Sequence, residues 1–402
     1  MKRAALLLCV LVLLAGAVAG GAQGSPAPSF EPASVTFVSL AQGWALGRAR
    51  CGVHRCLALR ATVDGGRSWS ARPLPAALVA AADRRFSGAA APYAVATLNV
   101  RFADPRNGWI YGEVLVAHHP GGGQPSYTQR ATLWSTHDGG RRWHAVALGG
   151  LGIQDELFDL EAARATAWLM VSTRQPGVAL RSTPVGADRW RAVRTPRLDD
   201  PAGGGPQTGD IVLADGAGWL VEGNDRGTIG SARLVGGRWV RWTPPCAPVG
   251  NSFAVPAAAD ARHLAAVCVM GGFAQGLTPS APHGATLGSS WLYTSADGGA
   301  SFRAGPALAR RDAGNPAALG GPIASPVPGT VVLGHGDLSS GRQSMVATFD
   351  GGRHWRTVAT GTPLFIGFTS PSQGVAIVHS AAGVDELLMT RDGGRTWTAV
   401  AF

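Results

Sequence analysis

Apolar and polar positions alternate in short runs along most of the chain, and turns that contain glycine separate the runs. Phe37–Gly47, FVSLAQGWALG, is typical, with an apolar strand, a turn ending in glycine and a second apolar strand. Alternation with a period of two predicts β-strands that bury one face. The pattern returns in three more segments: Phe102–Gly112, Ile211–Gly223 and Phe368–Val378. Because helical periodicity is hard to find beyond the first residues, we expect an all-β chain.

A second pattern is an eight-residue segment, S/T-x-D-G-G-x-x-W/F, which we call the octet. It occurs five times: Thr62–Trp69, Thr136–Trp143, Ser295–Phe302, Thr348–Trp355 and Thr390–Trp397. An Asp side chain can hydrogen-bond to backbone two residues onward, and Gly-Gly supplies positive φ angles, so each octet predicts a tight turn between antiparallel strands. The octet aspartates are therefore expected to brace hairpins: Asp64, Asp138, Asp297, Asp350 and Asp392. Calcium binding is the alternative, but it usually needs several oxygen ligands and each octet has a single carboxylate.

A strand pair followed by an octet and a last strand makes a four-stranded unit. Seven such units can be counted, near residues 34–75, 98–148, 157–194, 210–243, 252–304, 322–360 and 363–402. The third and fourth have altered turns, GADRW at Gly186–Trp190 and VGGRW at Val235–Trp239. Repeats of about 40–50 residues with four strands each predict a seven-bladed β-propeller. A β-sandwich would leave the repetition unexplained.

The octets and the Gly-Trp strands resemble the Asp-box, or BNR, repeat found in photosystem II assembly-factor-type propellers and in sialidase-like propellers. The resemblance covers residues 34–402 and implies the fold more than a function, because propellers host many activities. A sialidase would need an arginine cluster, a tyrosine with a Glu partner as nucleophile, and an Asp acid/base. Tyr111 and Glu113, two residues apart, are the best candidate pair, but the Arg-Ile-Pro type motif is absent around Ser34–Phe37.

Other catalytic signatures are missing from the sequence. It contains no H-E-x-x-H, G-x-S-x-G or C-x-x-C, and no Gly-rich phosphate loop between a strand and a helix. His118-His119 could help to bind a metal, but adjacent loop histidines are more often solvated. We therefore predict no catalytic residue, metal or cofactor. The expected function is a binding scaffold for a protein or polymer partner; the alternatives are a sialidase-like glycoside hydrolase and a cell-envelope polysaccharide-binding module.

The first residues have the pattern of an export signal. Lys2 and Arg3 precede the apolar run Ala4–Ala15, and small residues allow cleavage after Ala19 or Ala22. The run is short for a membrane span. We expect a signal peptide at 1–22, a linker at 23–33 and the propeller at 34–402, in a secreted, periplasmic or cell-envelope-associated monomer with no membrane span after signal removal.

Charge and cysteine content refine this picture. The formal net charge is +10, yet Lys2 is the only lysine, so a lysine Schiff base and a P-loop lysine are excluded from the mature chain. The arginines are scattered, and nucleic acid is not an expected partner of an exported protein.

Four cysteines remain after signal removal and predict two disulfides in an oxidising compartment. Of three possible pairings, proximity favours Cys51–Cys56 and Cys246–Cys268, with four free buried thiols as the alternative.

Loop lengths predict which face of the propeller binds a partner. Turns after the first and third strands of a blade share one face, and these are compact. The long insertions belong to the other face: Pro73–Asn99, Glu113–Arg130, Pro196–Gly209, Ala274–Ser290 and Ala304–Gly321. Long loops on a rigid scaffold often carry binding residues. The candidates are Arg and aromatic or His side chains: Arg84, Arg85, Phe86, His118, His119, Tyr127, Arg130, Arg310 and Arg311.

Overall fold

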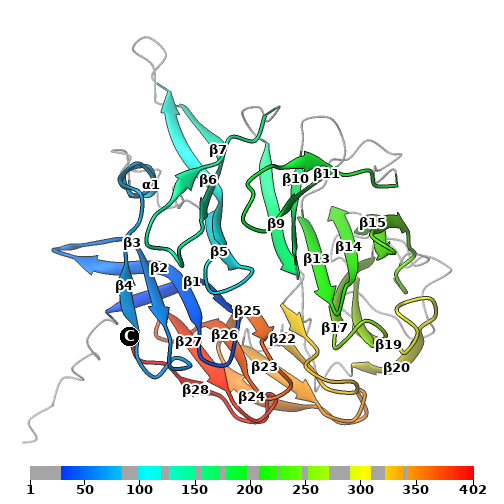
Figure 1. Ribbon diagram of the computed structural model, residues 1–402. Coiled ribbons are helices and arrows are strands. Elements are labelled where there is room, and N and C mark those ends of the chain that lie inside the picture. Colours follow the sequence, from blue (N-terminus) through cyan, green and yellow to red (C-terminus); the bar gives the residue numbers. More distant parts are fainter. Residues whose placement is uncertain are drawn as a thin grey trace, which may run out of the picture.

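The computed structural model is a ring of seven antiparallel sheets with four strands each (Figure 1). It describes residues 29–83, 97–118, 126–149, 155–163, 165–172, 178–196, 208–224, 227–246, 252–270, 290–308, 322–337 and 342–402. The chain is thus a seven-bladed β-propeller, as the alternation and the octets predict. No helix in these ranges is long and apolar enough to cross a membrane.

Each blade takes four consecutive strands, from the innermost to the outermost. The innermost strands are β1 (Phe30–Phe37), β5 (Thr97–Phe102), β9 (Glu156–Ala163), β13 (Thr208–Ala214), β17 (Ser252–Ala258), β21 (Ile323–Ala324) and β25 (Thr362–Phe368). The second strands are β2 (Gly43–Cys51), β6 (Gly108–His118), β10 (Thr166–Ser172), β14 (Ala217–Asn224), β18 (Leu264–Met270), β22 (Val331–Asp337) and β26 (Gly374–His379). The third strands are β3 (His54–Thr62), β7 (Ser126–Thr136), β11 (Val178–Pro184), β15 (Gly227–Val235), β19 (Ser290–Ser295), β23 (Arg342–Thr348) and β27 (Asp385–Thr390). The outermost strands are β4 (Ser70–Arg72), β8 (His144–Ala145), β12 (Arg191–Ala192), β16 (Arg238–Arg241), β20 (Arg303–Leu308), β24 (Arg356–Thr360) and β28 (Thr398–Ala399).

The hydrophobic core lies between neighbouring blades, because each sheet presents apolar side chains to the sheet beside it. Trp44 and Leu46 of blade 1, for example, belong to one buried cluster with Val100 and Phe102 of blade 2. The rings of Trp44 and Phe102 are stacked, with centroids 3.7 Å apart. Full burial of such a side chain contributes about 1.5–3 kcal/mol. The alternation seen in the sequence is therefore the packing of blade on blade.

The octets form the hairpin turns that their residue types predict. In the first, the Thr62 hydroxyl donates to Asp64 (2.8 Å) and accepts the N–H of Gly66 (2.9 Å). The Asp64 carboxylate accepts the N–H groups of Arg67 (3.0 Å) and Ser68 (2.9 Å). The Ser68 hydroxyl and these neighbouring donors hold the pKa of Asp64 well below its usual range. Similar bonds surround the other octet aspartates: Asp138, Asp297, Asp350 and Asp392.

Each octet is also bonded to the turn that follows the first strand of its own blade. The first octet glycine, Gly65, donates its N–H to the carbonyl of Ala41 at 2.8 Å. The equivalent bonds are Gly139 to Arg106, Gly298 to Arg262, Gly351 to Gly329 and Gly393 to Ser372. The two sets of turns therefore make one layer on one side of the ring, which we call the octet face.

A tryptophan of the second strand links some blades to the next octet. The indole N–H of Trp44 donates to Gly139 and that of Trp219 to Gly298, both at 3.1 Å. Trp109 faces blade 3, whose altered turn has no octet. Its indole N–H is buried and has no hydrogen-bond partner among the described residues. The altered turn of blade 3 thus coincides with the loss of a link between blades.

Both expected disulfides are present. Cys51–Cys56 closes the tip of the β2–β3 hairpin, and Cys246–Cys268 joins the end of blade 4 to β18 of blade 5. Cys246 and Cys268 are buried in the cluster between those blades. The second bridge therefore adds a covalent link between two sheets that otherwise meet through side chains.

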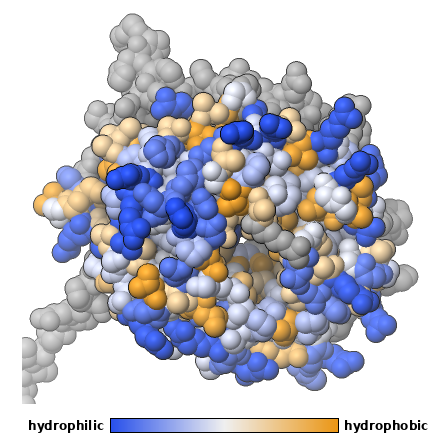
Figure 2. Space-filling view, in the orientation of Figure 1, coloured by the Kyte–Doolittle hydropathy of each residue, from blue (hydrophilic) through white to orange (hydrophobic). Residues whose placement is uncertain are grey.

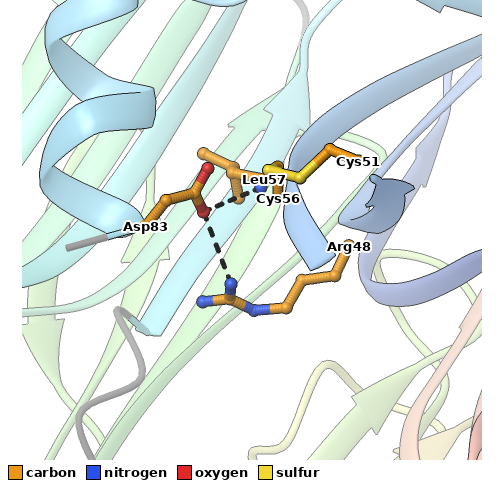
Figure 3. The surroundings of a disulfide bond; sticks show 5 residues. All are labelled: Arg48, Cys51, Cys56, Leu57 and Asp83. Carbon is orange, nitrogen blue, oxygen red and sulfur yellow. Dashed lines mark hydrogen bonds and ion pairs between the residues drawn. A yellow bond between two sulfur atoms is a disulfide. The ribbon is translucent and has the colours of Figure 1, made fainter. Parts of the chain in front are cut away.

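A short helix, α1 (Ala76–Ala82), is the clearest departure from the all-β expectation. It lies in the Pro73–Asn99 insertion and is too short to show a periodicity. Asp83, just after the helix, accepts the N–H of Leu57 at 2.9 Å and pairs with Arg48 at 3.4 Å (Figure 3). These bonds fix the helix end beside the Cys51–Cys56 hairpin.

A second departure concerns Glu113–Arg130, which the sequence suggested was a long loop. Most of it is strand, because β6 continues to His118 and β7 starts at Ser126, in unbroken register. The hairpin extends beyond the ring (Figure 1). β1 begins at Phe30, earlier than the expected boundary at residue 34.

The ring closes between blades 1 and 7 at what we call the seam. No strand is shared there, because every blade is made of consecutive strands. The Phe402 ring instead packs on Phe30 (centroids 4.5 Å apart) and Trp69 (5.0 Å), and its carbonyl accepts the Ser29 hydroxyl at 2.9 Å.

The substitution Phe402→Ala is expected to lower the free energy of unfolding by about 2–3 kcal/mol. This is somewhat less than for a fully buried phenylalanine, because Phe402 is half-buried. Urea denaturation would measure the loss. Leu364→Ala, at a side chain 50% exposed on β25, is the control and should change stability by less than about 0.5 kcal/mol. Equal effects of the two substitutions would show that Phe402 does not hold the seam.

Candidate functional site

A cavity of about 830 Å³ occupies the middle of the ring. All seven innermost strands contribute to its wall, and Figure 2 shows the surface hollowed at this place. The wall also includes residues of the turns after the first strands: Asp215, Ala259, Pro326 and Pro371. Since those turns lie beside the octets, the cavity reaches the octet face.

Five ionisable side chains gather on the part of the wall formed by blades 2, 3 and 4, and we call them the charged sector. They are Arg101 on β5, Tyr111 on β6, Asp159 and Glu161 on β9, and Asp210 on β13. Asp159 and Glu161 are alternate residues of β9 and therefore share one face of its sheet, and all five side chains line the cavity. Three carboxyl groups thus accompany one guanidinium, and Arg101 is the single arginine among the described residues of the wall.

Arg101 is held by two acceptors from the neighbouring blade. Its Nη2 donates to the Glu161 carboxylate and its Nε to the Leu160 carbonyl at 3.3 Å. The two charged side chains keep 22% and 20% of their surface exposed. They are therefore surrounded by protein but open to the cavity.

Asp159 is the centre of a second set of bonds. It accepts the Tyr111 hydroxyl at 3.3 Å and the backbone N–H of Ile211 at 2.9 Å. The Asp210 carboxyl lies beside Asp159, and burial and then the presence of Asp159 raise the pKa of Asp210. Two carboxyl groups that are buried side by side favour a state in which one of them keeps its proton.

Burial raises the pKa values of all three carboxyl groups. The pKa of Glu161 rises to about 8 and that of Asp210 to about 7, in each case because burial disfavours the charged form; the Arg101 charge opposes the rise. Burial also raises the pKa of Asp159, against the effect of Arg101. The pKa of the Tyr111 phenol is raised well above its usual value, first by burial and then by the Asp159 charge. At neutral pH the charged sector therefore retains at least one carboxyl proton and the phenol proton.

This arrangement can bind hydrogen-bond donors and positive charge through its carboxyl oxygens. Tyr111 is not set up as a nucleophile, because its phenol keeps its proton. Within the described residues, no group of three or more His, Cys, Asp or Glu side chains could hold a metal ion.

Of the residues suggested by the sequence, Tyr111 is in the cavity wall but has a different partner. The structure pairs it with Asp159 of the next blade rather than with Glu113. Glu113 instead accepts the N–H of Leu157 at 2.8 Å, and burial raises its pKa to about 7. Spacing along one strand could not reveal a partner that comes from another blade.

The loop residues proposed for docking are mostly outside the described residues: Arg84, Arg85, Phe86, His119, Arg310 and Arg311. His118 ends β6 and Tyr127 is near the start of β7, and Arg130 is exposed on β7. A docking face opposite the octet face thus stays a prediction.

Sequence reasoning missed Arg101, Asp159, Glu161 and Asp210. The sequence contains a pattern that could have identified these four residues, because they are charged positions in the innermost strands of three consecutive blades. The described innermost strands of blades 5, 6 and 7 carry none: FAVPAA within β17, IA in β21 and TPLFIGF in β25.

Comparisons with known proteins identify the fold and leave the family open. No family model matches the chain, and no curated protein sequence matches it. Among solved structures, YCF48 bound to a D1 peptide is 17% identical, with a TM-score of 0.50, over 90% of this chain and 92% of that chain. A PL25 ulvan lyase is 9% identical, with a TM-score of 0.50, over 93% of each chain. The β-propeller domain of the trilobed protease from Pyrococcus furiosus, described as having an open velcro topology, is 8% identical, with a TM-score of 0.50, over 93% of this chain and 98% of that chain. At such identities these likenesses show a shared β-propeller fold and no more.

Proposed function

We propose that this protein is an exported binding propeller that holds a segment of a protein or polymer partner in its central cavity without cleaving it. The observation that carries the proposal is the bonding of the charged sector. Arg101 is paired with Glu161, and Asp159 is bonded to Tyr111 and the Ile211 N–H, with Asp210 beside it. These bonds hold the side chains in place and leave three carboxyl groups to one guanidinium, an arrangement suited to binding a donor-bearing ligand.

The same bonds argue against a sialidase-like reaction. That reaction needs several arginines for the substrate carboxylate, whereas Arg101 is the single arginine in the described wall and is paired. It also needs an activated tyrosine, whereas the raised pKa of Tyr111 keeps its proton in place. A ligand with a carboxylate would in addition meet three carboxyl groups.

The charged sector favours a ligand that offers positive charge or many hydrogen-bond donors. Three carboxyl groups share one guanidinium, so a bound amine would lower the energy of their ionised forms. Hydroxyl-rich or amine-bearing polymers and lysine- or arginine-containing peptides have this chemistry. Two disulfides are typical of proteins outside the cytoplasm and support such an extracellular partner.

The fold relatives are compatible with either a binding or a catalytic role. YCF48 was solved with a peptide bound, and the ulvan lyase is an enzyme. They support the use of a propeller for binding a peptide, but the choice between the roles rests on the charged sector.

A glycoside hydrolase is the second candidate, and one observation favours it. Asp210, with a pKa of about 7, could donate a proton beside Asp159. However, the two carboxyls of a glycosidase usually stand about 5–9.5 Å apart so that a sugar and water fit between them. Asp159 lies beside Asp210 and already accepts the Tyr111 hydroxyl and the Ile211 N–H, so the pair does not resemble two separated carboxyls with oxygens free for a sugar and water.

Short chitosan oligomers and oligolysine, as amine-bearing probes, should bind the mature protein in calorimetric titrations. N-acetylated chitin oligomers of the same length and sialyllactose are the matched comparisons and should bind more weakly. Asp159→Asn with Asp210→Asn should weaken amine binding at least about tenfold. Asp385→Asn, on β27 of blade 7, is the control and should leave it unchanged.

Chromatography of the same mixtures should show no shortened oligomers and no released sialic acid. Release of products that stops in the Asp159/Asp210 variant would replace the binding proposal by the hydrolase. Absence of binding by every probe would overturn the assignment of the central cavity as the binding site.

A further inference from the structure

At two boundaries between blades, the same pair of positions on the octet face joins one blade to the next. The second residue of an octet contacts the sixth residue of the corresponding segment in the following blade. From blade 6 to blade 7, the Arg395 guanidinium lies 4.6 Å from the centroid of the Phe349 ring. From blade 2 to blade 3, His137 Nε2 is 2.8 Å from Asp188 Oδ2. Asp188 is the sixth residue of Thr183–Trp190, the segment that corresponds to an octet in blade 3.

In both cases the two side chains are complementary. A guanidinium lies on an aromatic ring at one boundary, and an imidazole meets a carboxylate at the other. The Asp188 carboxylate also accepts the Ser135 hydroxyl at 2.6 Å. The chain therefore places a carboxylate of its own between blades 2 and 3.

At the seam the same two positions hold like charges. The second residue of the last octet is Arg391, and the sixth residue of the first octet is Arg67. Both are exposed, and both line one cavity of about 340 Å³ on the octet face. Two cations that line the same cavity repel each other, so this boundary lacks the complementary partner that Asp188 supplies between blades 2 and 3.

We call this cavity the seam cavity. Only some of the side-chain hydrogen-bond donors that line it have an acceptor. Arg391 donates to the Gly65 carbonyl at 2.6 Å and to Gln373 Oε1 at 3.3 Å. The Arg67 guanidinium makes no hydrogen bond or ion pair to any residue that the structure describes. Gln373 is only 3% exposed, and its Nε2 is buried without a partner in the same described set.

The other residues that line the seam cavity limit the charge and shape of a ligand that can bind there. Asp64 also lines the seam cavity, but its carboxylate is already bonded to Thr62, to Ser68 and to the Arg67 backbone. Two guanidinium groups against one carboxylate leave a net positive charge. Leu40 and Ala41 add an apolar wall, and Leu40 is 56% exposed.

We propose that the seam cavity binds a carboxylate on an aliphatic stem, the chemistry of an acidic residue in a peptide, and that this carboxylate bridges Arg391 and Arg67. A carboxylate has two oxygens in the spacing that guanidinium groups match. The aliphatic stem lies against Leu40 and Ala41, which favours a peptide over a hydroxyl-covered uronic acid. The seam cavity and the central cavity have no lining residue in common, so this site goes beyond the proposed function.

The test is a titration of the mature protein with acetyl-Ala-Glu-Ala-amide, followed by NMR of the arginine side-chain N–H signals. The Glu peptide should shift the signals of Arg67 and Arg391 and bind at least about tenfold more tightly than its Gln counterpart. Galacturonate, a sugar that carries a carboxylate, tests whether the site prefers a sugar to a peptide. Equal binding of the Glu and Gln peptides, or tighter binding of galacturonate, would overturn the proposal.

The matched variant is Arg67→Asp, which gives blade 1 the residue that blade 3 has at this position. It should pair with Arg391, raise the melting temperature slightly and weaken binding of the Glu peptide at least about tenfold. Arg353→Asp is the control, because the partner position in blade 5 is Ala296, and it should bind like the unmodified protein. An equal loss in both variants, or no loss in Arg67→Asp, would contradict the site. Amine probes of the central cavity should bind Arg67→Asp normally, so failure here is distinguishable from failure of the proposed function.

Discussion

Replacing Arg101 by Met is expected to lower the free energy of unfolding by about 1.5–3 kcal/mol at pH 7.5. The Leu160 carbonyl and the Glu161 carboxyl each lose a charged hydrogen-bond donor, and such a bond usually contributes this much. The three carboxyl groups of Glu161, Asp159 and Asp210 would also lose the positive charge of Arg101, which lowers their pKa values. At pH 5 the electrostatic part of the loss should disappear, because Glu161 and Asp210 are then protonated with or without Arg101.

Urea denaturation at the two pH values measures this difference. Arg130→Met, at an exposed position on β7, is the control and should change stability by less than about 0.5 kcal/mol at either pH. An Arg101→Met penalty that is the same at pH 5 and pH 7.5 would show that electrostatics of the charged sector is not its cause.

The unmodified protein should itself become less stable from mildly acidic to mildly basic pH. The folded-state pKa values of Glu161 and Asp210, about 8 and about 7, lie above the ordinary values of 4.5 and 3.8. Below the ordinary values both states hold the protons; above them the unfolded chain releases protons that the folded state keeps, so stability falls until the folded-state pKa values are passed. The octet aspartates act oppositely, because their lowered pKa values stabilise the fold above their ordinary range and this stability is lost in strong acid. These groups together place the maximum stability near about pH 4–5.

Trp219→Ala is expected to cost about 3–5 kcal/mol, the range for removing a buried tryptophan. Trp219 is 1% exposed and its indole N–H donates to Gly298 of the next blade. The substitution therefore removes packing and an inter-blade hydrogen bond together. Thermal or urea denaturation gives the total loss.

Phenylalanine substitutions separate the hydrogen bond from the packing. Trp219→Phe leaves the Gly298 carbonyl without its donor, whereas the Trp109 indole N–H has no partner to lose among the described residues. Trp109→Phe should therefore be the milder change, by about 1 kcal/mol. The prediction fails if both Phe variants lose the same stability.

The fold could be predicted from the sequence because its signals are local. An octet such as TVDGGRSW contains the hydroxyl, the carboxylate and the glycines that make its own turn, and no distant residue is needed. The same is true of Cys51–Cys56, whose spacing suits one hairpin tip. Helix α1 was not predicted, because seven residues are too few to show a helical period.

The candidate site could not be predicted in the same way, because its contacts join different blades. Tyr111 was identifiable as a candidate, but its partner Asp159 lies 48 residues further along the chain. Arg101 and Glu161 are 60 residues apart. Alternation shows which side chains share one face of a sheet, while the packing of one blade against the next decides which of them meet across the boundary.

The seam also has a consequence for how the molecule folds and opens. Strands within a blade are neighbours in sequence, whereas the seam joins Ser29 to Phe402, 373 residues away. Contacts between distant residues close the largest loop and carry the largest entropic cost, so ring closure is expected to come last. Interactions that form after the rate-limiting step change the unfolding rate more than the folding rate. A carboxylate bound between Arg67 and Arg391 would thus lengthen the lifetime of the closed ring and leave the speed of its formation unchanged.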